Sequence, residues 1–198
     1  MDKVIVIDCG HGDRHHTKGK RSPKWSDGSQ YFEGEGNRII AKIAEQYLTK
    51  LGWKVLYTVD PSDPKDISLK DRIKISNLHY SIYPSAFQIS IHSNGFSKES
   101  ANGAEVFISK RASHLSRMLA YTWHIQQNIS LIDYLLKWRG VKTANFAMNR
   151  VNCPSILIET CFHTNEKECR ILMSDEGKER IAIAIVETCE RVHENRNK

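Results

Sequence analysis

The sequence predicts one α/β domain built around a largely parallel β-sheet. Short apolar runs of strand length alternate along the chain with longer segments whose apolar residues recur at helical spacing, an alternation typical of parallel sheets. The 198 residues are 40% hydrophobic, which is enough for one full core. No segment is poor enough in apolar residues to serve as a linker, so we expect residues 1–198 to form a single domain.

The first part of the chain predicts a strand, a long loop and a helix. Residues 4–7 are β-branched and are followed by polar and glycine residues, which is the pattern of a buried strand. Residues 15–30 are rich in Lys, Ser, Gly and Asp and have no apolar period, so we expect a surface loop. From Asn37 apolar residues recur at helical spacing as far as Leu51, and Gly52 ends this helix.

The rest of the chain continues the alternation of strands and helices. Further strands are expected at residues 53–58, 86–91, 105–108 and 155–158, and further helices at 69–78, 114–129 and 179–193. In sheets of this kind, functional sites form outside the carboxyl ends of the strands. The residues that follow the apolar runs are therefore the first candidates for a site.

Three of the apolar runs lead directly into residues that bind metals or carry protons. His11, His92 and Glu159 follow the runs that begin at residues 4, 86 and 155. A carboxylate from the Glu33 and Glu35 pair would complete a set of two imidazoles, one ligating carboxylate and one spare carboxylate acting as a base. Hydrolytic zinc sites need this inventory, with three protein ligands, an open position for water and a general base beside it.

The positive net charge of the chain suggests an anionic partner but does not identify it. The formal net charge is +6, but the basic residues are scattered and match no helix-turn-helix, zinc-finger or RNA-binding signature, so we expect no nucleic acid partner. Anionic polymers of a bacterial envelope would attract the same charge. A plain solvated surface is the other interpretation.

Several patterns bear on the compartment in which the chain is made. The N-terminus enters a strand without the apolar run of a signal peptide, and no segment approaches the roughly 20 apolar residues of a membrane span. Five cysteines lack CxxC spacing and form an odd set, which disfavours a zinc ribbon or a complete disulfide framework. We therefore expect a monomer made in a reducing cytoplasm, without membrane insertion.

Five segments, in order along nearly the whole chain, resemble the zinc-dependent N-acetylmuramoyl-L-alanine amidases of the amidase-3 family. They are residues 6–12 (VIDCGHG), 69–72 (LKDR), 90–94 (SIHSN), 103–106 (GAEV) and 156–165 (ILIETCFHTN). The resemblance implies a single domain with a twisted, mostly parallel sheet flanked by helices. It also implies one zinc ion bound by His11 and His92, with Glu159 as the catalytic carboxylate.

The resemblance also guides the choice of the third ligand. The family places a Glu four residues ahead of an Asn that begins the first long helix, and Glu33 stands four residues before Asn37. Glu33 is therefore the expected ligand, and Glu35 is the alternative. In its other role, Glu35 would be a favourable charge at the positive end of the helix dipole.

Other polar residues near the motifs have open roles. The family usually has Pro at the position of Cys9, which we expect to be a small buried hydrophobe rather than a ligand. His15 and His16 should be exposed or face the substrate. The remaining three residues each have two interpretations: His163 orients substrate or packs, Arg72 pairs with an acidic residue or is otherwise structural, and Asn94 bonds substrate or a ligand or is structural.

The resemblance implies hydrolysis of the amide between the lactyl group of N-acetylmuramic acid and L-alanine in peptidoglycan. A zinc peptidase that cuts inside the stem peptide and a non-catalytic wall-binding module are the alternatives. Absence of a signal peptide favours a phage endolysin that accumulates in the host cytoplasm and then degrades the cell wall. An autolysin exported without a cleavable signal and a catalytic domain of a longer protein are also consistent with the sequence.

Overall fold

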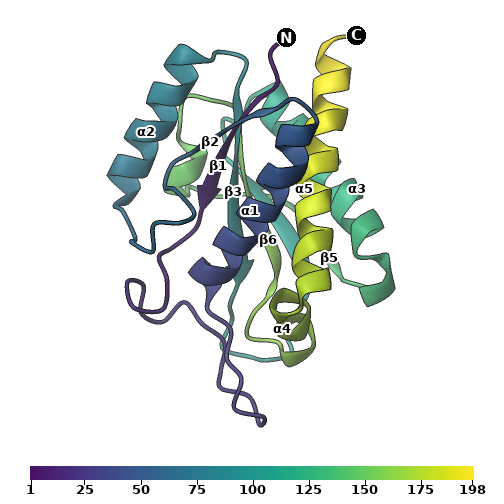
Figure 1. Ribbon diagram of the computed structural model, residues 1–198. Helices are drawn as coiled ribbons and strands as arrows, with labels where there is room; N and C mark the ends of the chain where they lie inside the picture. The colour runs from purple at the N-terminus through teal and green to yellow at the C-terminus, as the bar shows by residue number, and fades with distance from the viewer.

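Six strands form one sheet in the order β2-β1-β3-β6-β4-β5 in the computed structural model, which describes residues 1–198 (Figure 1). Neighbouring strands are parallel except β4 and β6, which are antiparallel. The predicted mostly parallel sheet is confirmed. The strand bounds are Val4–Cys9 (β1), Lys54–Tyr57 (β2), Phe87–Asn94 (β3), Ala104–Ile108 (β4), Trp138–Thr143 (β5) and Ser155–Phe162 (β6).

Helices cover both faces of this sheet. In Figure 1, α2 lies on one side of the strands, and α1 and α5 lie side by side on the other, with α3 next to α5. None of the helices combines the length and the apolar character needed to cross a bilayer. The helix bounds are Glu33–Lys50 (α1), Leu69–Ile82 (α2), His114–Ser130 (α3), Glu166–Met173 (α4) and Asp175–Arg196 (α5), with 3-10 turns at Ile132–Tyr134 and Ala147–Asn149.

The two faces of β1 explain its uninterrupted apolar sequence. Ile5 and Ile7 belong to the large core cluster that includes residues of α1, α3 and α5. Val4 and Val6, which point the other way, belong to a small cluster that contacts Tyr80 of α2. A strand in a parallel sheet is buried on both faces, so apolar residues occupy successive positions instead of alternating with polar ones.

The loop between β1 and α1 is better anchored than expected. The predicted loop at residues 15–30 contains no helix or regular strand, which confirms the prediction. Trp25 is nevertheless only 8% exposed, and its indole Nε1 donates to Cys169 Sγ at 3.4 Å. Tyr31 is also buried. These two aromatic side chains attach the loop to the core, so the loop is partly buried and does not lie entirely on the surface.

Several element boundaries differ from the sequence predictions. Helix α1 begins at Glu33 rather than Asn37, because two glycines of low helix propensity hide its first turn. Strands β3 and β6 continue past their apolar runs, so His92 and Glu159 lie within strands instead of after them. Helices α2 and α5 are longer than expected. Strand β5 and helix α4 were not predicted at all.

Candidate metal centre

Three side chains from three separate elements converge at the carboxyl edge of the sheet. His11 follows β1, Glu33 is the first residue of α1, and His92 lies near the end of β3. One ligand atom from each residue lies within 4.8 Å of the other two. Glu33 Oε1 is 3.0 Å from His92 Nδ1 and 3.5 Å from His11 Nε2, and the imidazole planes are nearly perpendicular at 88°. The structure thus brings together the three residues predicted as ligands.

The other carboxylate of the pair points elsewhere. Glu35 accepts hydrogen bonds from Arg14 Nε at 2.7 Å and Arg14 Nη2 at 2.8 Å, and its side chain is 30% exposed. Residues two apart on a helix lie on nearly opposite sides, so only one of the two glutamates can face the histidines. That residue is Glu33, which is 2% exposed.

A strained backbone places the His11 imidazole. His11 has φ of 64°, in the left-handed region that residues with a Cβ rarely adopt. Arg38 Nη1 donates to the His11 carbonyl oxygen, and Asn37 Nδ2 donates to the Gly10 carbonyl oxygen at 3.1 Å. Gly34, in the first turn of α1, allows this close approach because a Cβ there would lie 1.7 Å from the Gly12 oxygen. The start of α1 therefore both supplies Glu33 and holds His11.

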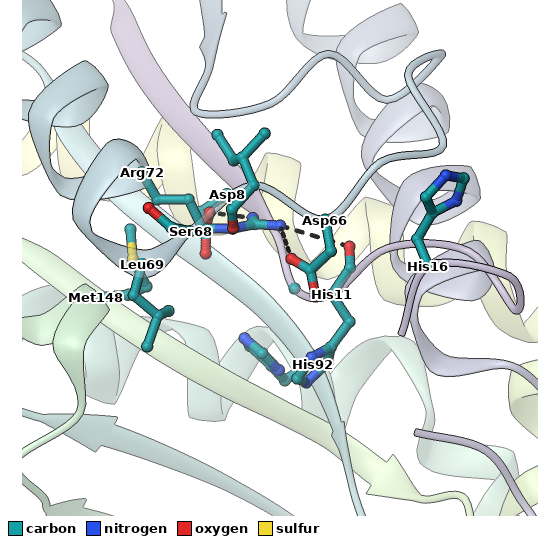
Figure 2. Close-up of a pocket in the computed structure, with 11 residues that line it drawn as sticks. Asp8, His11, His16, Asp66, Ser68, Leu69, Arg72, His92 and Met148 are labelled. Carbon is teal, nitrogen blue, oxygen red and sulfur yellow. Dashed lines mark hydrogen bonds and ion pairs between the residues drawn. The ribbon is translucent and has the colours of Figure 1, made fainter. Parts of the chain in front are cut away.

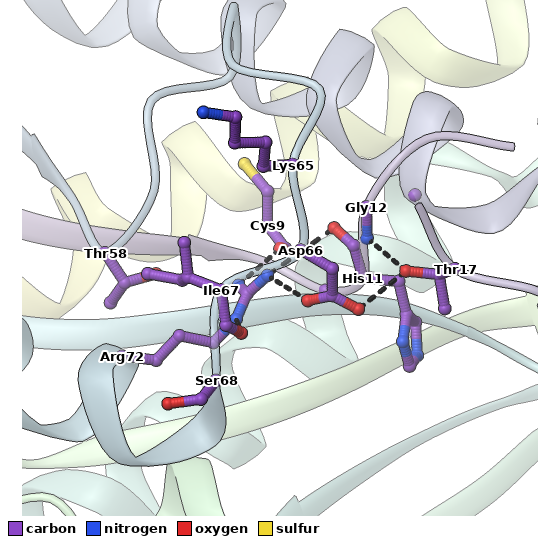
Figure 3. Close-up of polar contacts among 12 residues, drawn as sticks. Cys9, His11, Gly12, Thr17, Thr58, Lys65, Asp66, Ile67, Ser68 and Arg72 are labelled. Carbon is purple, nitrogen blue, oxygen red and sulfur yellow. Dashed lines mark hydrogen bonds and ion pairs between the residues drawn. The ribbon is translucent and has the colours of Figure 1, made fainter. Parts of the chain in front are cut away.

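A buried network of charges supports the same loop from the other side (Figure 3). Arg72 is 2% exposed, and its Nη1 donates to Asp8 Oδ1 and to the Cys9 oxygen, both at 2.7 Å. Its Nη2 donates to Asp66 Oδ1 at 3.0 Å, while Asp66 Oδ2 accepts from Thr17 Oγ1 at 2.6 Å. The expected pairing of Arg72 with an acidic residue is confirmed, and the network connects α2 to both ends of the His11 turn.

Glu159 lies beside the cluster on the same face of the sheet. It pairs in register with His92 on β3 and with Glu105 on β4, and directly opposed residues project to the same side. Its Oε2 is buried without a hydrogen-bond partner. Burial raises the pKa of Glu159 to about 8; the nearby charge of His92 lowers it, while Glu33 and Glu105 raise it further. An unpaired carboxylate oxygen here is available to a water or a substrate.

Two of the three cluster residues, His11 and Glu33, carry the protonation state that a metal requires. Burial lowers the pKa of His11 to about 4, so its imidazole is neutral at pH 7. Burial alone would raise the pKa of Glu33, but its hydrogen bond to His92 and the charge of His92 lower it to about 2. The same bond holds the pKa of His92 above its ordinary value despite burial. A bound cation would take the place of that proton, because ligating imidazoles must be neutral.

The donor set fits catalytic zinc. Two imidazole nitrogens and one carboxylate oxygen form the His₂Glu set of hydrolytic zinc sites, which leave a fourth position open. The unpaired Oε2 of Glu159 lies next to this set, as a general base for water would. Cys9 is fully buried, and burial raises the pKa of its thiol to about 12, so it fits the small hydrophobe expected there.

Three adjoining cavities form a groove with the cluster near its middle. The first, of about 450 Å³, is lined by His11, His92 and Arg72 among others (Figure 2). The second, of about 490 Å³, also contains both histidines and adds Glu33 and Glu159. The third, of about 340 Å³, shares lining residues with the second and extends over β4 and β5. A long, polar substrate can therefore lie across the cluster.

The remaining predicted residues have distinct surroundings. His15 and His16 are exposed, as expected, and His16 Nδ1 lies 2.6 Å from Asp13 Oδ1, with its ring apart from the two cluster histidines (Figure 2). His163 is 5% exposed, lies 3.0 Å from Ser93 Oγ through its Nδ1, and lines the second cavity. The backbone turn that follows β6 therefore brings a further imidazole into the groove.

One group of charged residues was missed by the sequence predictions. Glu105 is 4% exposed and accepts hydrogen bonds from Asn94 Nδ2 at 2.6 Å, from Arg139 Nε at 2.7 Å and from Lys142 Nζ. Glu105 belongs to the 103–106 segment that resembles the family, but no role was predicted for it. Both cations lie on β5, the strand that was not predicted.

Residues 5–191 match the model of the amidase-3 family, described as N-acetylmuramoyl-L-alanine amidase. The chain belongs to this family. The amidase LytC of Bacillus subtilis strain 168 is 30% identical over 190 residues, which cover 93% of this chain and 34% of LytC. The chain thus spans about a third of the length of that relative.

Solved amidase structures share the fold over nearly the whole chain. An N-acetylmuramoyl-L-alanine amidase from Clostridium difficile 630 is 28% identical with a TM-score of 0.82, covering 98% of this chain and 97% of its own. The catalytic domain of the amidase CwlV from Bacillus (Paenibacillus) polymyxa var. colistinus is 25% identical with a TM-score of 0.78, covering 97% and 98%. The six-stranded sheet and its helices are therefore the fold that these amidases share.

Proposed function

We propose that this amidase-3 protein hydrolyses the amide between the lactyl group of N-acetylmuramic acid and L-alanine in peptidoglycan. The observation that carries the proposal is the convergence of His11, Glu33 and His92 beside an unpaired, buried carboxylate oxygen of Glu159. Family membership supports the choice of bond. Residues 1–198 would act as one catalytic domain on the cell wall.

One zinc ion per chain, held by His11, Glu33 and His92, is part of the proposal. Zinc in such sites acts as a Lewis acid that lowers the pKa of water to about 7 and polarises a carbonyl oxygen. Arg38 and Arg72 hold the loop that carries His11, and α1 holds Glu33, so these ligands are positioned before zinc arrives. Little reorganisation is then needed on binding.

Glu159 is proposed to move the proton. Its carboxylate accepts a proton from the attacking water and then delivers it to the nitrogen of the departing L-alanine, which otherwise could not leave. Burial raises the pKa of Glu159, and the positive charge of a zinc ion bound beside it would lower that pKa, so that the carboxylate is ionised and able to accept the proton. The absence of a hydrogen-bond partner at Oε2 keeps this oxygen free for both transfers.

The unpaired Glu159 also argues against a non-catalytic wall-binding module, which has no use for a base at this position.

Cell-wall lysis, as a phage endolysin or an autolysin, is the proposed biological outcome of the reaction. Anionic wall polymers are proposed to attract the net charge of +6.

Product analysis tests the proposal. Purified peptidoglycan is digested with the zinc-loaded protein, and new amino termini and new reducing sugars are measured. Free L-alanine amino termini without new reducing sugars support the amidase. Amino termini of other stem residues would instead identify a peptidase, and absence of any product would refute the hydrolytic proposal. The Glu159→Gln variant, treated identically, controls for contaminating hydrolases.

A further inference from the structure

A row of charged side chains crosses the sheet from the cluster toward its far edge. His92 on β3 is directly opposite Glu159 on β6, and Glu159 is directly opposite Glu105 on β4. Opposed residues on neighbouring strands project to the same face, so the three side chains share one face of the sheet. Arg139 on β5 continues the row through its bond to Glu105.

A β-bulge aims Arg139 into this row. On β4 only Glu105 separates Ala104 from Val106, but their partners on β5, Trp138 and Val141, are separated by two residues. These two residues are Arg139 and Gly140, and Gly140 has φ of 100°, which glycine adopts without steric cost. Bulges of this type redirect a side chain next to a functional site.

Arg139 is held in place but still has donors to offer. Its Nε donates to Glu105 and its Nη1 donates to the Asn102 oxygen at 3.2 Å, while its guanidinium lies 4.9 Å from the centre of the Phe162 ring. These contacts leave Nη2 without a partner among the protein groups. The side chain is 29% exposed, so a ligand in the third cavity can reach it.

The charge around the third cavity is positive. Burial alone would raise the pKa of Glu105, but the hydrogen bonds from Lys142 and Arg139 hold it below its usual value, so the carboxyl is ionised. One negative charge thus faces two positive charges. Lys98 also lines the cavity and adds a third cation. An anionic group would be attracted here.

We propose that the third cavity, with Arg139 as its principal donor, binds a carboxylate on the peptide part of the substrate. The inference rests on the proposed function. Once its lactyl carboxyl is in amide linkage, the muramoyl sugar carries no negative charge, so the carboxylates of the substrate lie on the peptide. The leaving peptide would accordingly run from Glu159 across β4 toward β5.

The spacing of the strands sets the position of that carboxylate. Glu159 and Arg139 are two strand positions apart, and neighbouring strands lie about 4.8 Å apart, so the two backbones are separated by roughly 10 Å. An extended peptide spans about 3.3–3.6 Å per residue. About three residues therefore bridge the distance, and the recognised carboxylate belongs to the third residue of the leaving peptide.

The test compares two synthetic muramoyl tripeptides that differ only at the C-terminus, one a free carboxylate and the other a carboxamide. For the wild-type, zinc-loaded enzyme we expect kcat/KM to favour the carboxylate by about tenfold, mostly through KM, as one charge-assisted hydrogen bond would give. Arg139→Gln should abolish this preference, and Arg139→Lys should restore part of it. Arg191→Gln removes the same charge from α5 and should keep the full preference.

The outcomes separate the two proposals. Cleavage of both peptides by the wild type at equal kcat/KM would overturn the carboxylate site while supporting the amidase. Full preference retained in Arg139→Gln would overturn the role of Arg139. Failure to cleave either peptide, or wall fragments with longer stems, would refute the proposed function itself. The wild-type comparison needs no variant, so the inference remains testable if Arg139→Gln does not fold.

Discussion

Replacement of Arg72 by Met should destabilise the protein strongly while leaving its fold class unchanged. Arg72 and Asp8 are 2% and 0% exposed, and the guanidinium bonds both Asp8 and the Cys9 carbonyl oxygen. Met matches the apolar stem of Arg but supplies no donor. The substitution therefore leaves a buried carboxylate without its counter-ion.

The size of the effect follows from that burial. Removing one partner of a buried ion pair costs about 3–5 kcal/mol, since the remaining charge is uncompensated. Hydrogen bonds to Asp8 from Ser90 and Thr58 persist and place the expected loss toward the lower end of this range. For a domain of this length, such a loss lowers the melting temperature by roughly 6–20 °C.

Chemical denaturation of four proteins at one saturating zinc concentration measures the effect. They are the wild type, Arg72→Met, Asp8→Asn and the double variant. The free energy of unfolding of the double variant should fall by less than the sum of the decreases in the two single variants, because each single change already breaks the ion pair. Additive losses, or a loss below about 1 kcal/mol for Arg72→Met, would refute the reasoning.

The same pair predicts a pH dependence. Burial raises the pKa of Asp8, but the charge of Arg72 and the hydroxyl bonds lower it below its ordinary value. This stabilisation is fully present above the unfolded pKa of about 3.9 and is lost as pH falls through the folded pKa. Without Arg72 the burial effect dominates, so the folded pKa of Asp8 rises. The loss of unfolding free energy in Arg72→Met, relative to the wild type, should therefore be largest near pH 7 and should become smaller toward pH 4.

Three further predictions concern the ligands, the helix start and the surface charge. Glu33→Ala should lose stoichiometric zinc by metal analysis, whereas Glu35→Ala should keep it because Glu35 is bonded to Arg14; the reverse result would make Glu35 the ligand. Gly34→Ala should cost about 1–3 kcal/mol in thermal or chemical unfolding, since its Cβ would lie 1.7 Å from the Gly12 oxygen, and an unchanged stability would contradict this packing. Binding to isolated cell walls should weaken from low to physiological salt, where exposed charges are screened over about 8–10 Å, while hydrolysis of a small muramyl peptide changes far less. Equal salt sensitivity of both would remove the argument from surface charge.

Periodicity predicted the elements that the core buries most completely. Strands β1, β3 and β6 are apolar because both of their faces are covered. Strand β5 was missed because its sequence, WRGVKT, is only partly buried at the edge of the sheet and carries two charges and a glycine. The beginning of α1 was missed because Gly34 is required for close packing and not for helix propensity.

The cluster itself was predictable because its residues belong to short motifs. His11, Glu33 and His92 lie 22 and 59 residues apart in sequence, yet all three lie at the same edge of the sheet: His11 follows β1, Glu33 begins α1 and His92 is near the end of β3. The supporting contacts were not predictable, since nothing local distinguishes Arg38 from other helical arginines. Glu105 and Arg139 meet only through the pairing of β4 with β5 and its bulge, which are properties of tertiary structure.

Turnover of the Glu159→Gln variant tests the central claim most directly. Gln preserves the size of the side chain but cannot accept the proton from water or pass it to the leaving nitrogen. With zinc content and melting temperature checked on the same preparation, the rate on a muramyl peptide should fall by about 10²–10⁴, the range for lost general acid–base catalysis. Turnover within a few-fold of the wild type would contradict the catalytic assignment of Glu159.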